Sequence, residues 1–171
     1  VAEQGYVEAQ VNLGLMYLNG HGVEQDYQSA RDWFLKAARE GYADAQYNLG
    51  LMYEKGRGVK QDYRLAASWY RDAAIQGQAN AQYNLANIHY HGQGVPQSFM
   101  KAYLWASQCA KQNKAISEKA KRIVALVSPK VTPLQIADAE RMAQIYSDGP
   151  SFKGYVTYSK GTEAYERGDY A

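Results

Sequence analysis

A segment of nine residues occurs three times in this chain, each time 36 positions further on. Residues 9–17 read AQVNLGLMY, residues 45–53 read AQYNLGLMY, and residues 81–89 read AQYNLANIH. A period of about 20 to 50 residues is typical of solenoids, because one unit of that size cannot bury its apolar face alone and must stack on its neighbours. The repeat therefore predicts an array of stacked units.

Each unit is interpreted as two helices joined by a turn. In the first unit we expect a helix over about residues 7–19, because apolar residues recur there at helical spacing. A Gly-x-Gly turn at residues 20–22 ends this helix, and Asp26 is placed to cap a second one. The second helix is expected to carry Trp33 inward and to end at Gly41.

Two glycines fall inside the expected first helices. Gly14 and Gly50 occupy equivalent positions, and the third unit has Ala86 there. Because a glycine inside a helix costs about 1 kcal/mol relative to alanine, a compensating gain is required. We expect two helices to come into close contact at this position.

The recurring residues resemble the Sel1-like repeat family, a subfamily of the tetratricopeptide-like α-solenoids. The pattern Ala-x3-Leu-Gly-x2-Tyr-x2-Gly-x-Gly-Val-x2-Asp-x3-Ala-x2-Trp covers about residues 2–109. The resemblance implies an all-α fold, a right-handed α-α superhelix of helix pairs over about residues 2–37, 38–73 and 74–109, with a C-terminal helical cap. It also implies an adaptor or scaffold that assembles protein complexes, without naming the partner.

The repeat pattern decays after residue 109, and residues 110–148 are expected to form the capping helices. Residues 114–127 read as one amphipathic helix. Residues 132–135 (TPLQ) form a capping box with proline at the first helical position, so a second helix is expected to run to about Tyr146. A terminal cap of this kind keeps a solenoid soluble.

The last segment, residues 149–171, is rich in tyrosine. Residues 162–171 resemble the junction between the two helices of a repeat. Three interpretations stay open: a truncated further repeat, a flexible tail, or a segment that docks on the N-terminal unit of its own or a neighbouring chain. In the third interpretation the docking residues are Tyr158, Tyr165 and Tyr170.

Candidate nucleophiles and metal ligands are few. Cys109 stands where the other units have Ala37 and Ala73, so it is predicted to be a small buried residue. His89 and His91 are two residues apart on a helix and do not face each other, which makes them a poor metal pair. His89 stands where the other units have tyrosine, and we expect it to be packed in the core.

No catalytic set is predicted. Asp62 and Asp72 are interpreted as ordinary helix-surface charges. We therefore expect no enzyme activity, no cofactor and no metal. A hydrolase of a cell-wall or β-lactam type substrate is kept as an alternative, although the chain lacks the paired cysteines of the family members that bind penicillin-type ligands.

Composition narrows the class of protein further. The net charge is +2, from 19 basic and 17 acidic residues without a basic block, which disfavours a nucleic-acid-binding protein. No apolar run reaches the roughly 18 residues of a membrane span. The resemblance favours the bacterial periplasm or cytoplasm, and whether a segment upstream of Val1 has been removed stays open.

The remaining candidate for a functional site is a binding surface. In tetratricopeptide-like arrays the first helices line a concave groove, so we expect the residues of these helices that do not enter the core to meet a partner. They are Val11, Asn12, Leu15, Tyr47, Asn48, Leu51, Glu54, Tyr83, Asn84, Asn87 and Tyr90. The three asparagines 36 residues apart either hold a peptide backbone or bond the adjacent helix.

The sequence thus predicts a protein-interaction scaffold that binds a peptide segment or partner protein in its groove, where a few aromatic residues contribute most of the binding energy. The alternative from a different class is a structural protein that self-assembles through residues 151–171.

Overall fold

The structure, a computed structural model, describes residues 2–112 and 115–148. Within these residues it contains helices and turns and no strand. The elements are α1 (Ala2–Asn19), α2 (Tyr27–Arg39), α3 (Ala43–Lys55), α4 (Tyr63–Ile75), α5 (Ala79–His91), α6 (Phe99–Ala110), α7 (Ser117–Val127), the 3-10 helix η1 (Ser128–Lys130) and α8 (Pro133–Asp148).

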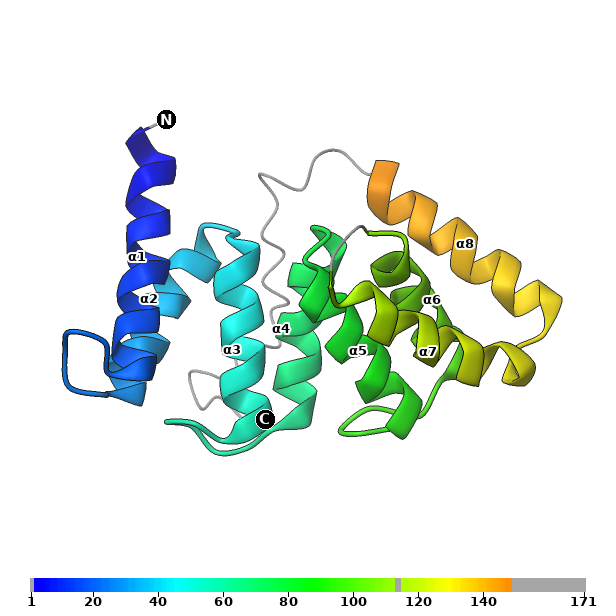
Figure 1. Ribbon diagram of the computed structural model, residues 1–171, viewed down its shortest axis with the longest axis horizontal. Helices are drawn as coiled ribbons and strands as arrows, with labels where there is room; N and C mark the ends of the chain where they lie inside the picture. Colours follow the sequence, from blue (N-terminus) through cyan, green and yellow to red (C-terminus); the bar gives the residue numbers. More distant parts are fainter. Residues whose placement is uncertain (1, 113–114, 149–171) are drawn as a thin grey trace, which may run out of the picture.

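From α1 to α7 each helix packs against the next as an antiparallel neighbour, and α8 packs against α6, so the helices form one row from α1 at one end to α8 at the other (Figure 1). The first helices α1, α3 and α5 follow one another along the row, and α7 continues it. The predicted all-α solenoid with a helical cap is confirmed. Boundaries differ slightly: α1 begins at Ala2 rather than near residue 7, and α7 begins at Ser117 rather than residue 114.

The glycines inside the first helices lie against aromatic rings of the second helices. A Cβ atom added at Gly50 would lie 2.5 Å from the ring of Tyr70, and one at Gly14 would lie 2.6 Å from the ring of Phe34. Both rings are fully buried, at 0% exposure. The predicted close contact is therefore present, and it explains why these two helices tolerate glycine.

In the third unit a different pair of residues forms the contact between the two helices. It has Ala86 at the glycine position, and the residue equivalent to Tyr70 is Ala106. Both alanines are fully buried. The extra methyl group on the first helix is thus matched by loss of the ring on the second helix.

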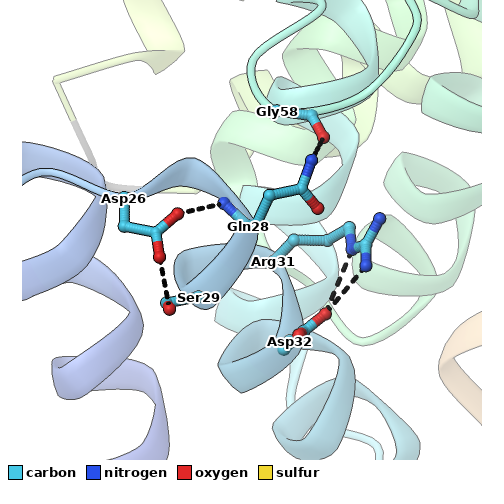
Figure 2. A network of polar contacts seen from close by, with 6 residues as sticks. All are labelled: Asp26, Gln28, Ser29, Arg31, Asp32 and Gly58. Carbon is cyan, nitrogen blue, oxygen red and sulfur yellow. Dashed lines mark hydrogen bonds and ion pairs between the residues drawn. The ribbon is translucent and has the colours of Figure 1, made fainter.

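Neighbouring units meet where the Gly-x-Gly turn of one approaches the second helix of the unit before it. Gly58 has φ +67°, and a Cβ atom there would lie 2.5 Å from Cβ of Tyr27, so both its conformation and its contact require glycine. Figure 2 shows the amide Nε2 of Gln28 donating to the carbonyl oxygen of Gly58 at 2.6 Å, beside Asp26, which caps α2. Gly94 approaches Tyr63 in the same way.

In the C-terminal cap a lysine stands at the position of the glycine that contacts the preceding unit. Lys130 occupies the position 36 residues after Gly94. Its Nζ lies 4.5 Å from the ring centroid of Phe99 and 5.3 Å from that of Tyr90. The capping box of α8 is present as predicted: Thr132 and Gln135 each donate a backbone N–H to the other's side chain, at 2.9 and 3.2 Å.

The N-terminal unit is less covered than the units that follow. Met16 is 38% exposed, whereas the equivalent Met52 is 1% exposed. Trp33 is only half-buried, contrary to its predicted inward position, with Nζ of Lys36 4.1 Å above its ring. Among the described residues no helix pair precedes α1, so no neighbouring unit covers these two side chains.

A first prediction concerns the glycine–ring contact. Gly50→Ala should destabilise the protein by about 1–3 kcal/mol, because the new methyl group meets a buried ring that has no room to move. The measurement is urea unfolding followed by circular dichroism.

The matched control is Gly5→Ala, since Gly5 lies in α1 with nothing within 4 Å of an added Cβ atom. It should be neutral or stabilising, because alanine has the higher helix propensity. In a Tyr70→Ala background the added cost of Gly50→Ala should largely disappear. Equal effects of the two glycine substitutions would contradict the packing explanation.

Candidate functional site

The predicted groove residues belong to α1, α3 and α5, and we call the side of these helices that carries their partly exposed members the first-helix face. Asn12 is exposed, and Val11 is only 7% exposed and belongs to the core, which leaves it little surface for a partner. The other predicted residues are half-buried: Leu15, Tyr47, Asn48, Leu51, Glu54, Tyr83, Asn84, Asn87 and Tyr90. Val11 was placed outward by helical periodicity, whereas α1 packs it inward.

A polar and aromatic cluster joins the second and third units beneath this face. The buried Tyr70 of α4 donates its hydroxyl to Oε2 of Glu54 at 2.6 Å and also contacts the Asn84 side chain by a hydrogen bond. Its ring centroid lies 5.9 Å from that of Tyr47. Burial, with the neighbouring Glu54 carboxylate, raises the pKa of the Tyr70 hydroxyl, so it stays a hydrogen-bond donor. Three of the predicted partner-binding residues therefore have structural contacts as well.

The three equivalent asparagines have different surroundings. Asn48 donates to the carbonyl oxygen of Asp44 on its own helix at 2.8 Å, whereas Asn84 bonds Tyr70 on the adjacent helix. Asn12 is exposed. Bonding to the adjacent helix, one of the two alternatives from the sequence, thus describes Asn84 only.

One edge of the first-helix face carries carboxylates bound to the next unit. Oη of Tyr42 donates to Glu8 at 2.8 Å, and Nε2 of Gln78 donates to Asp44 at 3.3 Å. The hydrogen bond raises the pKa of the Tyr42 hydroxyl. These contacts link α1 to the start of α3, and α3 to the residue that caps α5.

Cys109 is fully buried, as predicted, and its Sγ lies 3.3 Å from the carbonyl oxygen of Ala79. In residues 2–112 and 115–148 no three His, Cys, Asp or Glu side chains lie close enough to hold a metal ion. No helix in that same part of the chain is both long and apolar enough to cross a membrane.

Two side chains near α4 differ from what the sequence indicated. Asp72 is not an ordinary surface charge: its side chain is 19% exposed, and burial raises its pKa to about 6 against the opposing effect of Arg71. Asp62, the other carboxylate, caps α4 by accepting from the N–H groups of Arg64 and Leu65. His89 is half-buried rather than fully packed.

His89 has an incomplete set of hydrogen bonds. Its Nδ1 is buried and has no partner among the described residues, while the ring bonds the backbone of Pro96. Burial first, and then the nearby Lys101, lower the pKa of His89 to about 4. The imidazole is therefore neutral at pH 7.

Comparison with known proteins identifies the repeat. The family model described as Sel1 repeat matches residues 7–42, 43–78 and 79–114. The period is the one predicted, but each matched unit begins a few residues later than the predicted unit. A comparison with curated proteins found no match.

Two solved structures are similar to this chain over most of its length. One is a protective antigen present in uropathogenic Escherichia coli strains that displays an SLR fold, with 34% identity, a TM-score of 0.72, and coverage of 99% of this chain and 34% of the antigen. The other is a Sel1 repeat protein from Oxalobacter formigenes, with 41% identity, a TM-score of 0.64, and coverage of 72% of this chain and 91% of that protein. This chain thus spans about a third of the antigen.

A second prediction uses the depressed pKa of His89. Between pH 6.5 and about 4 the unfolded chain binds more protons at this position than the folded one, so His89 lowers the stability as the pH falls through that window. His89→Tyr, which restores the residue of the other units, removes this effect. The unfolding free energy of the variant, relative to the parent protein, should rise as the pH drops from about 7 to about 4.5.

The measurement is urea unfolding of both proteins at several pH values. Asp72, whose raised pKa acts in the opposite direction over part of the same window, is present in both and cancels in the difference. A difference that does not change with pH would show that His89 titrates alike in the folded and unfolded chains.

Proposed function

The chain belongs to the Sel1-repeat family, and from this premise we propose that it is a non-enzymatic scaffold whose first-helix face binds a peptide segment of a partner protein. The family fold commonly serves as a protein-interaction scaffold. The proposal adds the place of binding and the kind of ligand.

One observation carries the proposal: apolar and aromatic side chains remain partly exposed in a row along the face. Leu15, Leu51 and Tyr83 come from three successive first helices and are all half-buried. Side chains in this state lose little further entropy on binding and still have apolar area to bury, which favours them as contacts for a partner. Glu54 and the exposed Asn12 add polar groups that can pair with a peptide backbone.

The test begins with peptides selected from a random displayed library on the immobilised full-length chain. Peptides that use this face should bind with micromolar affinity and should lose at least tenfold in affinity to a Leu51→Ala/Tyr83→Ala variant. Tyr47 is left unchanged because its ring contacts Tyr70 in the core. Fluorescence anisotropy gives the dissociation constants.

The matched control is Asp32→Ala/Arg39→Ala, which removes two exposed side chains of α2 away from the first-helix face. This variant should bind the selected peptides as the parent does. Unchanged affinity for the Leu51→Ala/Tyr83→Ala variant, with its circular dichroism intact, would place the binding site elsewhere.

A second candidate function, self-association, is favoured by the exposed N-terminal unit. Met16 is 38% exposed and Tyr6 65% exposed, at the end of the row where a preceding helix pair would pack. Tyr158, Tyr165 and Tyr170 of the predicted docking segment lie outside the described residues. Their sequence resembles a repeat junction, so the occupant inferred for this end is the C-terminal segment of the same or a neighbouring chain.

Deleting residues 151–171 tests this candidate. If the segment docks between chains, the mass from light scattering should fall; if it docks within the chain, the mass should stay constant and the melting temperature should fall by several degrees. Met16→Lys in the full-length chain should give the same change as the deletion. A deleted chain with unchanged mass and unchanged stability would exclude docking.

A further inference from the structure

A cleft of about 500 Å³ lies apart from the first-helix face, since none of the residues of that face lines it. Its walls come from the second helices α4 and α6 and from the cap helix α8, which lies beside α6 in Figure 1. Leu85 and His89 of α5 and the turn before α6 complete the lining. We call this the back cleft.

The floor of the back cleft is apolar and well packed. Leu85, Leu104 and Trp105 line it and are at most 4% exposed. The Trp105 ring stacks on Tyr146 of α8, with centroids 5.4 Å apart and planes 11° apart. A floor of this kind has the size and chemistry to accept an apolar side chain of a ligand.

The charged groups of the back cleft are all basic. Arg64 and Arg71 lie seven residues apart on α4, on one side of the helix, and Lys101 comes from α6. No Asp or Glu is among the described residues that line it. Arg71 pairs with Asp72 at 3.4 Å, but neither Arg64 nor Lys101 forms an ion pair within the described part of the chain. Two positive charges are thus left for a ligand.

His89 also lines the cleft, and its ring bonds the backbone of Pro96. Its Nδ1 atom is buried, so a ligand in the cleft does not reach it. His89 therefore contributes a wall of the cleft and can report on its occupancy.

The apolar floor and the unpaired basic groups point to one class of ligand. We propose that the back cleft binds an acidic peptide segment, with an apolar side chain on the Leu104–Trp105 floor and carboxylates paired with Arg64 and Lys101. A peptide unites carboxylate and apolar groups within a few residues. A nucleic acid would require a longer basic stripe than the cleft presents. The site is separate from the first-helix face and does not depend on binding there.

The probe is a fluorescein-labelled peptide of about ten residues with a central Leu-Phe flanked by Asp and Glu, titrated against the full-length chain at low salt. Two matched peptides replace the acids by Asn and Gln, or the central pair by Gly-Ser. The acidic apolar peptide should bind at least tenfold more tightly than either matched peptide. Only this peptide can both bury an apolar side chain on the floor and pair carboxylates with Arg64 and Lys101. Equal binding of the three peptides, or no binding up to about 1 mM, overturns the proposal.

Variants place the binding in the cleft. Arg64→Gln/Lys101→Gln should lower the affinity at least tenfold, and Arg64→Glu/Lys101→Glu should abolish it, while the exposed positions of both residues leave the fold intact. The control Lys36→Gln/Arg39→Gln removes the same charge from α2, away from the cleft. An equal loss in the control would show non-specific attraction and overturn the proposal.

A second readout reports on His89. Because His89 lines the cleft, its ring ¹⁵N resonances should shift in NMR spectra on addition of the acidic apolar peptide, and Arg64→Gln/Lys101→Gln should suppress the shift at the same peptide concentration. A peptide that binds without moving these resonances occupies another surface, which also overturns the proposal. The groove variant Leu51→Ala/Tyr83→Ala should keep the shift, and it thereby separates this site from the one proposed above.

Discussion

The contact between an aromatic ring on the second helix and a glycine on the first sets the distance between the two helices of a unit. Tyr70 packs on Gly50 so closely that no Cβ atom fits between them. Because of this contact, the Tyr70 hydroxyl reaches through to Glu54 and takes part in the first-helix face. The same helix, α4, presents Arg64 and Arg71 to the back cleft. One tightly packed helix therefore supports both candidate binding surfaces.

The repeated residues determine the stacking of the helix pairs. Function is inferred from the positions where one unit has a different residue from the other units. Lys130 stands where the preceding units have glycine, and it closes the array through its contacts with Phe99 and Tyr90. Lys101 stands where the second unit has Leu65, and His89 where the first two units have tyrosine. Departures of this kind do not serve the packing that all units share, so they are the positions at which a repeat protein can acquire a ligand. They were the signal in the sequence that could have revealed the back cleft.

Much of the fold was predictable because it depends on residues close in sequence. The helix pairs, the capping by Asp26, the capping box before α8 and the burial of Cys109 follow from spacing and from comparison of equivalent positions. Periodicity failed where burial depends on the neighbouring unit. Trp33 remains half-buried because the first unit has a neighbour on one side only among the described residues. Val11 enters the core, whereas the larger tyrosines at the equivalent positions, Tyr47 and Tyr83, stay half-buried.

The sequence by itself determined the architecture: the 36-residue period predicts stacked units, and the helical spacing of apolar residues on both sides of each glycine turn makes each unit a helix pair. Only the tertiary structure decided which side chains meet. Arg64, His89, Lys101 and Tyr146 come from four helices, and no local pattern links them, since their place around one cleft depends on how α4, α5, α6 and α8 pack together. The burial of Asp72 was equally hidden, because the protein environment and not the residue type sets the pKa of a carboxyl group.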